Sequence, residues 1–245
     1  MIVTVPGFDY SDANGIINFT KAATMAPFCI GRAAYGLVPD ALFKVNFPAA
    51  AKAGMINGVY QFGDYRDYAK NNVTALAKIL AGLQPDFVCL DLEQNERFWP
   101  GAWPSVEQSS RLTSWVWDWV TAYQLEGLTY PIVLYTNVSA LQQLRAWPAK
   151  LDQIVSAMAL WLAWWNPGLP QPETYSPWPK VSFIQEAESQ AGHAFGMQSV
   201  GVDPDYWTSD LDDLRAFVGQ AQRGPTLDQR MNVVESILRT HGWMD

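Results

Sequence analysis

The sequence predicts an α/β fold, a single closed barrel that is TIM-like but irregular. Short apolar runs rich in Val, Ile and aromatic residues recur along the chain, and helical patterns separate those in the first half. Eight such runs in 245 residues fit a closed barrel better than an open sheet. We expect the strands at 2–5, 28–33, 58–62, 87–93, 131–136, 159–165, 182–185 and 199–203.

Two helical patterns lie between predicted strands. One extends from about residue 68 to residue 83, and the other starts at a capping box of Ser105 and Gln108 and ends at Gly127. The apolar residues of the second helix repeat at helical spacing: Leu112, Trp115, Val116, Trp119, Val120 and Tyr123. After Trp147 the strands come closer together and leave room only for short helices or loops such as 166–180, so we expect the barrel to be irregular there.

Composition and charge exclude several functions. Sixteen basic and 24 acidic residues give a net charge of −8, which does not suit binding to nucleic-acid phosphates. The longest apolar run, 158–165, is far shorter than the roughly 18 residues that a membrane-spanning helix needs. Cys29 and Cys89 lie in apolar runs typical of buried thiols, and the only histidines are His193 and His241. We therefore expect no metal site and no cofactor, and an enzyme of this composition must use carboxylates.

Acidic residues stand where predicted strands end. The first run leads into Asp9, the fourth ends with Asp91-Leu92-Glu93, and the eighth ends at Asp203. Catalytic residues of such barrels lie at the carboxyl ends of the strands. Because side chains alternate along a strand, Asp91 and Glu93 should point to the same face, into the barrel mouth.

Carboxyl groups crowded into a partly apolar mouth cannot all be ionised at ordinary cost. One of them should have a raised pKa and be able to donate a proton, which is the arrangement that glycoside hydrolysis uses. The 12 Trp residues agree with this, because flat apolar rings suit sugars, although many will be core residues. The Asp91-Leu92-Glu93 pattern is also compatible with a solvated loop, a Ca²⁺ or Mg²⁺ ligand pair, or charge at a helix N-terminus.

A series of short motifs follows a fixed order along the chain. They are Gly7-Phe8-Asp9-Tyr10-Ser11, Arg32-Ala33-Ala34-Tyr35-Gly36, Gly58-Val59-Tyr60-Gln61-Phe62, Leu90-Asp91-Leu92-Glu93, Tyr135-Thr136-Asn137, Leu160-Trp161-Leu162-Ala163, Gln185 and Val202-Asp203. Each motif is weak alone. In this order and spacing, from Val5 to about Phe217, the chain resembles the Chalaropsis-type lysozymes, glycoside hydrolase family 25.

The resemblance implies a fold and an activity. The fold is a barrel of five β/α units followed by three strands. The activity is cleavage of the β-1,4 bond between N-acetylmuramic acid and N-acetylglucosamine in peptidoglycan. By similarity, Glu93 would be the general acid, Asp91 would assist beside it, and Asp9 and Asp203 would complete an acidic ring. Whether the substrate's own N-acetyl group or a water attacks next stays open.

The same positional match implies a substrate groove. The residues expected to line it are Tyr60, Tyr135, Trp165 and Gln185, each of which could equally be a barrel-filling side chain. The chain also departs from the family pattern. The departures are Gln61 for a common His, Tyr35 for a small or acidic residue, Glu186 for a frequent Tyr and Asp205 for a usual Asn. None of them changes the four acids, which favours an active enzyme.

Two other functions remain compatible with the sequence. One is a catalytically silent glycan-binding module on the same barrel, and the other is a structural component of a phage particle. The start of the chain carries no signal-like segment. This fits a phage-encoded lysin that is released from the host cytoplasm with help and acts at the bacterial cell wall, or a chain that begins at its mature domain.

A helix is predicted after the barrel. We expect the catalytic barrel in residues 1–223 and a helical extension in 224–245, opened by a capping box of Thr226 and Gln229. Apolar residues follow at spacings of four and three: Leu227, Met231, Val234 and Leu238. Two heptads leave two options open, self-association through this helix or packing of the helix on the barrel.

Overall fold

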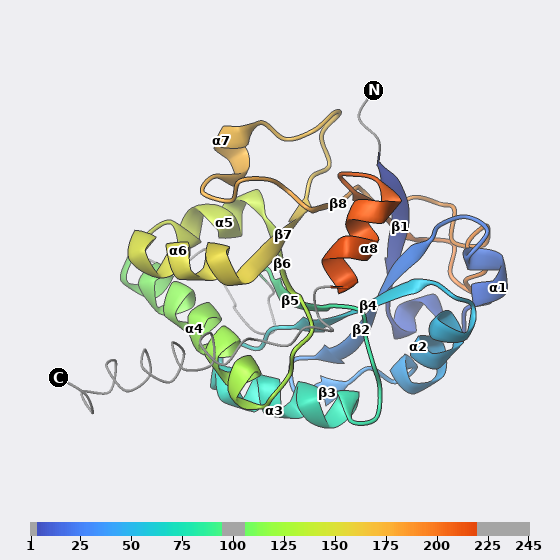
Figure 1. The fold of residues 1–245 in the computed structure, drawn as a ribbon, viewed down its shortest axis with the longest axis horizontal. Helices are drawn as coiled ribbons and strands as arrows, with labels where there is room; N and C mark the ends of the chain where they lie inside the picture. Colours follow the sequence, from blue (N-terminus) through green and yellow to red (C-terminus); the bar gives the residue numbers. More distant parts are fainter. Residues whose placement is uncertain (1–3, 95–105, 220–245) are drawn as a thin grey trace.

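The computed structural model describes residues 4–94 and 106–219, which form a barrel surrounded by helices (Figure 1). The strands are β1 (Val5–Tyr10), β2 (Phe28–Tyr35), β3 (Val38–Pro39), β4 (Ile56–Phe62), β5 (Val88–Leu92), β6 (Ile132–Asn137), β7 (Met158–Ala163), β8 (Phe183–Gln185) and β9 (Asp203–Trp207). The helices are the 3₁₀ turn η1 (Asp12–Asn14), α1 (Phe19–Ala22), α2 (Phe43–Lys52), α3 (Ala69–Leu80), α4 (Val106–Leu125), α5 (Val138–Leu144), α6 (Pro148–Ala157), α7 (Pro172–Tyr175) and α8 (Leu211–Gly219).

Eight of these strands close the barrel. Their order is β1-β9-β8-β7-β6-β5-β4-β2, and pairing of β1 with β2 completes the circle. The short strand β3 forms a hairpin with β2 and lies outside the circle. Neighbouring barrel strands are parallel from β1 through β2 to β8, whereas β9 runs antiparallel to both of its neighbours, β8 and β1. The prediction of a closed α/β barrel is therefore confirmed.

The barrel is irregular after β7, in the part of the chain where the sequence predicts it. Each of β1, β2, β4, β5 and β6 is followed by helical structure on the outside of the barrel. From β7 onward, the three remaining barrel strands are separated by loops and by the four-residue helix α7. This matches the expected five β/α units followed by three strands.

Two predicted strands are misplaced. The first is β1, which is described at Val5–Tyr10 and continues through Pro6 and Gly7 beyond the predicted end at Val5, whereas residues 2 and 3 of the prediction lie outside the described residues. Pro6 precedes the first β1–β2 pair, Gly7 with Phe28, so its missing N–H is not required there. The last barrel strand begins at Asp203 instead of ending there, because Pro204 does not break an antiparallel strand of which it is the second residue.

The predicted helices are confirmed where the structure describes them. The pattern at 68–83 becomes α3, and the longer pattern becomes α4, which stops just before Gly127 at a φ of 74°. The proposed cap Ser105, the helix predicted at 226–241 and the boundary between 223 and 224 lie outside the described residues. Cys29 and Cys89 are buried free thiols, as expected.

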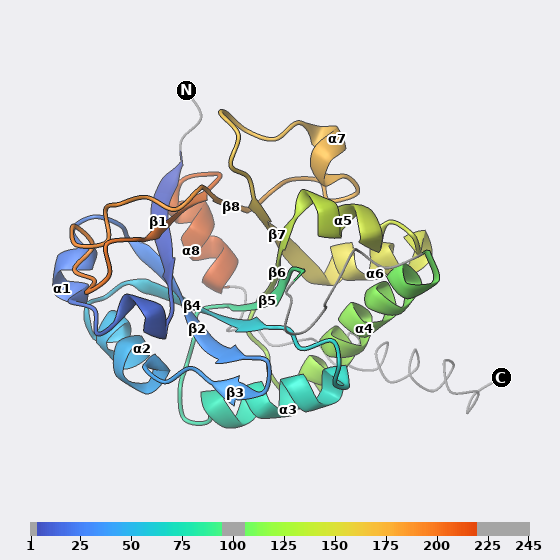
Figure 2. The ribbon, with the colours of Figure 1, turned by 180° about the vertical axis from the view of Figure 1, so that it is seen from behind.

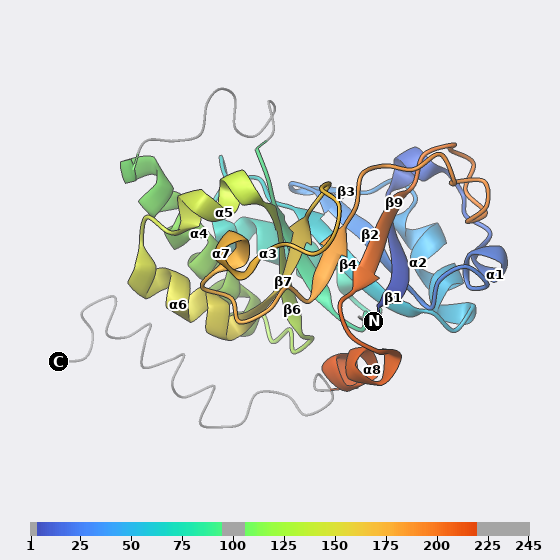
Figure 3. The ribbon, with the colours of Figure 1, turned by 90° about the horizontal axis from the view of Figure 1, so that it is seen from above.

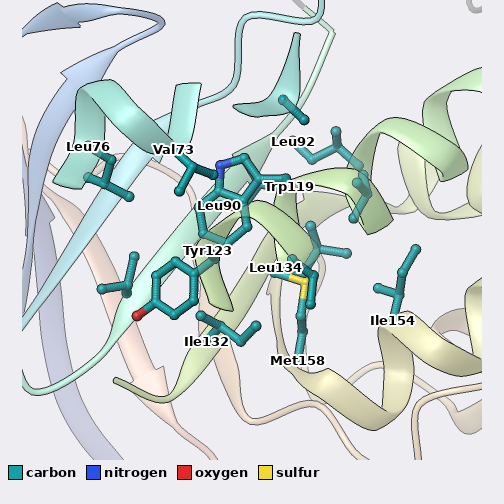
Figure 4. Close-up of a cluster of buried hydrophobic side chains, with 14 of the residues drawn as sticks. Val73, Leu76, Leu90, Leu92, Trp119, Tyr123, Ile132, Leu134, Ile154 and Met158 are labelled. Carbon is teal, nitrogen blue, oxygen red and sulfur yellow. The ribbon is translucent and has the colours of Figure 1, made fainter. Parts of the chain in front are cut away.

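The outer core lies between the barrel and its helices. Every second residue of a barrel strand faces outward, so Leu90 and Leu92 of β5 pack against apolar residues of α3 and α4 such as Val73 and Trp119 (Figure 4). Burial of this layer removes large apolar surfaces from water and fixes which face of β5 points inward.

Aromatic rings fill the inner core. Phe28, Phe87 and Phe183 pack inside the barrel, and Phe183 meets Trp207 with ring centroids 4.8 Å apart. Helix α8 lies beyond the end of β9 (Figure 3), where its Phe217 ring lies 5.4 Å from that of Trp207. Aromatic rings therefore close the amino-terminal end of the barrel, so a functional site is expected at the carboxyl-terminal end.

A long loop between β8 and β9 crosses over the outside of α1 (Figure 2). Two hydrogen bonds hold it there: the backbone N–H of Asn18 donates to the Gly196 carbonyl at 2.9 Å, and the Lys21 Nζ donates to the His193 carbonyl at 2.6 Å. These contacts hold the loop that leads into β9 against α1. No helix among the described residues is long and apolar enough to cross a membrane.

The inner core predicts the effect of one small substitution. A Cβ atom at Gly58 in β4 would lie 2.3 Å from the ring of Phe87, which is fully buried and stacks on the ring of Phe183. We expect Gly58→Ala to lower the free energy of unfolding by about 1–3 kcal/mol, the usual cost of overpacking. Gly219→Ala, where nothing lies within 4 Å, is the control. Equal urea midpoints for the two variants would contradict this description of the barrel interior.

Candidate active site

The carboxyl-terminal end of the barrel carries an inward-facing layer of carboxyl groups. Asp9 of β1 stands directly opposite Asp203 of β9 in the antiparallel ladder. Asp205, two residues further along β9, stands opposite Gln185 of β8. Opposite side chains in such a ladder are only about 4.5–5.5 Å apart at Cβ. The sheet register alone therefore places these groups side by side.

Strand β5 supplies two more acids. Asp91 is buried and faces inward, and Glu93 follows directly after the end of the strand and is partly buried. Leu90 and Leu92 face the outer helices, so the predicted alternation of faces is confirmed. Glu93 and Asp91 lie close enough to Asp9 for each charge to influence the next.

The reversed direction of β9 explains why Asp203 reaches this layer. A parallel strand delivers its last residues to the mouth, whereas an antiparallel strand delivers its first residues there. Asp203 is the first residue of β9, and Asp205 is the third. The structure thus brings the four predicted acids together and adds a fifth, Asp205, which the sequence analysis noted only as a departure.

A chain of hydrogen bonds ends on Asp9. The Tyr135 hydroxyl donates to Oε1 of Gln185 at 2.7 Å, and Nε2 of Gln185 donates to Oδ2 of Asp9 at 2.7 Å. Because the tyrosine occupies the amide oxygen, the amide nitrogen is turned toward Asp9. This arrangement favours Asp9 as an ionised acceptor.

Arg32 is the cation that acts on this layer, and the sequence analysis did not single it out. Its Nε donates to Asp40 at 2.9 Å, and its NH2 group forms an ion pair with Asp12. Its positive charge lowers the pKa values of Asp9 and Asp91, against the larger effect of burial. The sequence did contain a sign of this role. Arg32 follows Ile30 by two residues in an otherwise apolar strand, so it shares the inward face of that strand.

Tyr65 is a second residue that the sequence analysis missed. Its hydroxyl donates to the backbone carbonyl of Asp91 at 3.3 Å, and the Gly63 backbone N–H donates to the same oxygen at 2.9 Å. The Tyr65 ring meets the Trp115 ring of α4 edge to face at 4.9 Å. These contacts hold the end of β5, from which Glu93 projects.

Burial and like charges shift the pKa values of the acids in one direction. Burial and, to a smaller extent, the negative charge of Asp203 raise the pKa of Glu93 to about 7. Burial also raises the pKa values of Asp9, Asp91 and Asp203. For Asp9 the charge of Asp203 adds to the rise, while the hydrogen bond from Gln185 opposes it. The acids therefore cannot all be ionised at neutral pH.

The residues expected to line a groove fall into two groups. Tyr60, Tyr135 and Gln185 are buried in the barrel wall close to the acids. Trp165 lies two residues beyond β7 and is 70% exposed, so it stands outside the acid layer. Among these four residues, Trp165 is the one whose side chain is mostly exposed to solvent.

Metal ions in proteins are held by groups of side chains such as His, Cys, Asp and Glu. No group of three or more His, Cys, Asp or Glu side chains in 4–94 and 106–219 has the geometry to hold one. Carboxyl groups such as those of this layer can transfer protons and stabilise positive charge.

Comparisons with known proteins find solved structures with a similar fold. Three solved structures are similar to the chain: a bacterial lysozyme from Streptomyces coelicolor (TM-score 0.71, 23% identity, 89% of this chain and 98% of the other), a muramidase from Trichobolus zukalii (0.67, 22%, 87% and 98%), and the autolysin LytC from Streptococcus pneumoniae in complex with a synthetic peptidoglycan ligand (0.64, 19%, 83% and 46%). At these identities the likeness shows the fold. A search among curated proteins finds no match.

The family is shown by the sequence match. The model of "Glycosyl hydrolases family 25" matches residues 8–192, which is more than half of the chain and includes Asp9, Asp91, Glu93 and Gln185. The chain belongs to glycosyl hydrolases family 25.

Proposed function

We propose that this protein is a peptidoglycan hydrolase, an N-acetylmuramidase that acts at the bacterial cell wall. The observation that carries the proposal is Glu93, a carboxyl group at the barrel mouth whose pKa is raised to about 7 by burial and by Asp203. A carboxyl group that keeps its proton near neutral pH can protonate a glycosidic oxygen. Family membership supports this function, as do the lysozyme, muramidase and autolysin among the similar structures.

Each acid has a proposed role. Glu93 donates its proton to the oxygen that links N-acetylmuramic acid to N-acetylglucosamine, and the C–O bond on the muramic acid side breaks. Positive charge then develops on the muramic acid ring, and negative charge on Asp9 stabilises it while Asp91 assists beside Glu93. A water attacks C1 of the muramic acid, either directly or after the substrate's own N-acetyl group has done so. The proton that this water loses returns to Glu93. Asp203 keeps Glu93 protonated through like-charge repulsion. Trp165 contacts a sugar ring through its exposed face.

The bond that is cleaved can be identified directly. Purified peptidoglycan is digested with the protein, and the fragments are reduced and analysed by mass spectrometry. We expect muropeptides that end in reducible muramic acid. Fragments that end in reducible glucosamine would contradict the proposed bond. Intact glycan with retained binding would favour the silent glycan-binding module instead.

Glu93→Gln tests the proposed general acid. The amide keeps the size of the side chain and loses the transferable proton, so we expect turnover to fall by about 10²–10⁴-fold while the fold and peptidoglycan binding persist. Glu173→Gln in the exposed helix α7 is the matched control and should behave like the parent protein. Activity of Glu93→Gln within a few-fold of the parent would remove Glu93 from this role.

A protonated Glu93 and an ionised neighbour together predict a bell-shaped dependence of activity on pH. Activity requires protonated Glu93, so its basic limb should fall as pH rises through about 7. Activity also requires at least one of Asp9, Asp91 and Asp203 to be ionised, so an acidic limb should fall as pH is lowered. Asp203→Asn removes a like charge, lowers the pKa of Glu93 and should move this basic limb to lower pH. Asp152→Asn on the exposed side of α6 should leave the limb in place. A soluble muroglycan should be used as substrate, and a flat profile from about pH 4 to 9 would rule out the raised-pKa mechanism.

Tyr135→Phe tests the hydrogen-bond chain to Asp9. Without the hydroxyl, Gln185 is held less firmly, its donation to Asp9 weakens, and the pKa of Asp9 rises. We expect the acidic limb of activity to move up by roughly half to one pH unit, the equivalent of one neutral hydrogen bond. Tyr130→Phe removes a similar hydroxyl, which donates to the Leu83 carbonyl away from the acids, and should not move the limb. A shift of equal size in both variants would argue against the chain.

A further inference from the structure

Asp205 is a buried carboxyl group to which the proposed reaction assigns no role. It lies in β9 between Gly7 of β1 and Gln185 of β8, and its side chain has no exposure to solvent. Gly7 has no Cβ because the ring of Phe28 occupies that space, at 2.1 Å from where the Cβ would lie. Asp205 therefore sits at the boundary between the acid layer and the aromatic rings of the inner core.

The two oxygens of Asp205 differ. Oδ1 accepts a hydrogen bond from Nε1 of Trp161 in β7 at 2.9 Å. Oδ2 is buried and has no hydrogen-bond partner among the described residues, and within the same residues Asp205 forms no ion pair. An ionised carboxylate with an unpaired buried oxygen is far more costly than a neutral acid in the same place.

The hydrogen bond from Trp161 favours an ionised Asp205, but the titratable groups that surround Asp205 do not offset a negative charge. Asp9 and Asp203 are the acids nearest to it, and the other titratable groups that act with it are the Cys89 thiol of β5 and the phenols of Tyr135 and Tyr206. The positive charge of Arg32 acts instead on Asp9, to which Gln185 also donates a hydrogen bond.

We propose that Asp205 is a positioning residue that works as a neutral carboxylic acid. As such it anchors the indole of Trp161, and of the two neighbouring acids Asp205 and Asp9 only Asp9 carries a negative charge. Burial raises its pKa well above the ordinary value, and the charge of Asp9 adds to the rise. Its role in catalysis rests on the proposed function. Its protonation does not.

The anchored indole supports the wall of the site. The Trp161 ring meets the Tyr135 ring at 4.5 Å and the Tyr60 ring at 6.3 Å, both edge to face. Tyr135 is the first donor in the hydrogen-bond chain that ends on Asp9. Asp205 thus acts on Asp9 in two ways. It holds Trp161 against Tyr135, and because it is neutral it does not repel the negative charge of Asp9.

Two neutral replacements separate these effects. Asp205→Asn keeps an oxygen that accepts from Trp161, and we expect turnover within about threefold of the parent with the acidic limb of the pH profile unmoved. Asp205→Leu leaves the indole N–H unpaired, and we expect kcat to fall at least about tenfold, roughly the effect of one unpaired buried donor. An acidic limb that moves down in Asp205→Asn would show that Asp205 was ionised. Equal turnover of the two variants would overturn the anchoring role.

Unfolding at different pH values tests the protonation without any activity. A carboxyl group with a raised pKa in the folded protein costs stability as pH rises from its unfolded value of about 4 toward the folded value. Asp205→Asn removes that cost, so its urea midpoint should gain on the parent's by a margin that grows as pH rises above about 4.5. Asp152→Asn on the surface should show no such growth. A constant margin, or a loss that grows with pH, would overturn the proposal even if the protein hydrolysed peptidoglycan.

Discussion

The crowding of carboxyl groups at one end of the barrel is the constraint on which the rest of the site depends. Asp9, Asp91, Asp203 and Asp205 face inward together with Glu93, and burial raises the pKa of each. Arg32 offsets part of this charge but is already paired with Asp40 and Asp12. Protons must therefore remain on some of these groups at neutral pH, and a retained proton is what an acid catalyst needs.

The barrel produces this crowding by reversing one strand. If the last barrel strand were parallel to the others, Asp203 and Asp205 would lie toward the end that Phe217 and the inner rings close. The antiparallel β9 brings both to the open end, opposite Asp9 and Gln185. Each raised carboxyl pKa costs folding stability as pH rises above about 4. Apolar burial in the outer core between β5 and the helices α3 and α4 stabilises the folded protein and offsets this loss of stability.

Much of this could be predicted from the sequence, because strand alternation and apolar patterns are local properties. The faces of Asp91 and Glu93 followed from Leu90 and Leu92, and the end of α4 followed from Gly127. The direction of β9 could not be predicted, because strand direction depends on how distant segments pair. The roles of Tyr65 and Asp205 were missed for the same reason. Tyr65 supports a strand 26 residues away, and Asp205 bonds to an indole 44 residues away.

Glu93 keeps its proton near neutral pH because burial and the charge of Asp203 raise its pKa. Side-chain carboxyl ¹³C labelling of glutamate, followed by NMR titration of the parent protein and of Glu93→Gln to assign the signal, measures this directly. We expect the Glu93 carboxyl to titrate with a midpoint near 7 and Asp203→Asn to lower this midpoint. A Glu93 signal that titrates near 4.3, the ordinary value of an exposed glutamate, would show that its surroundings do not hold the proton.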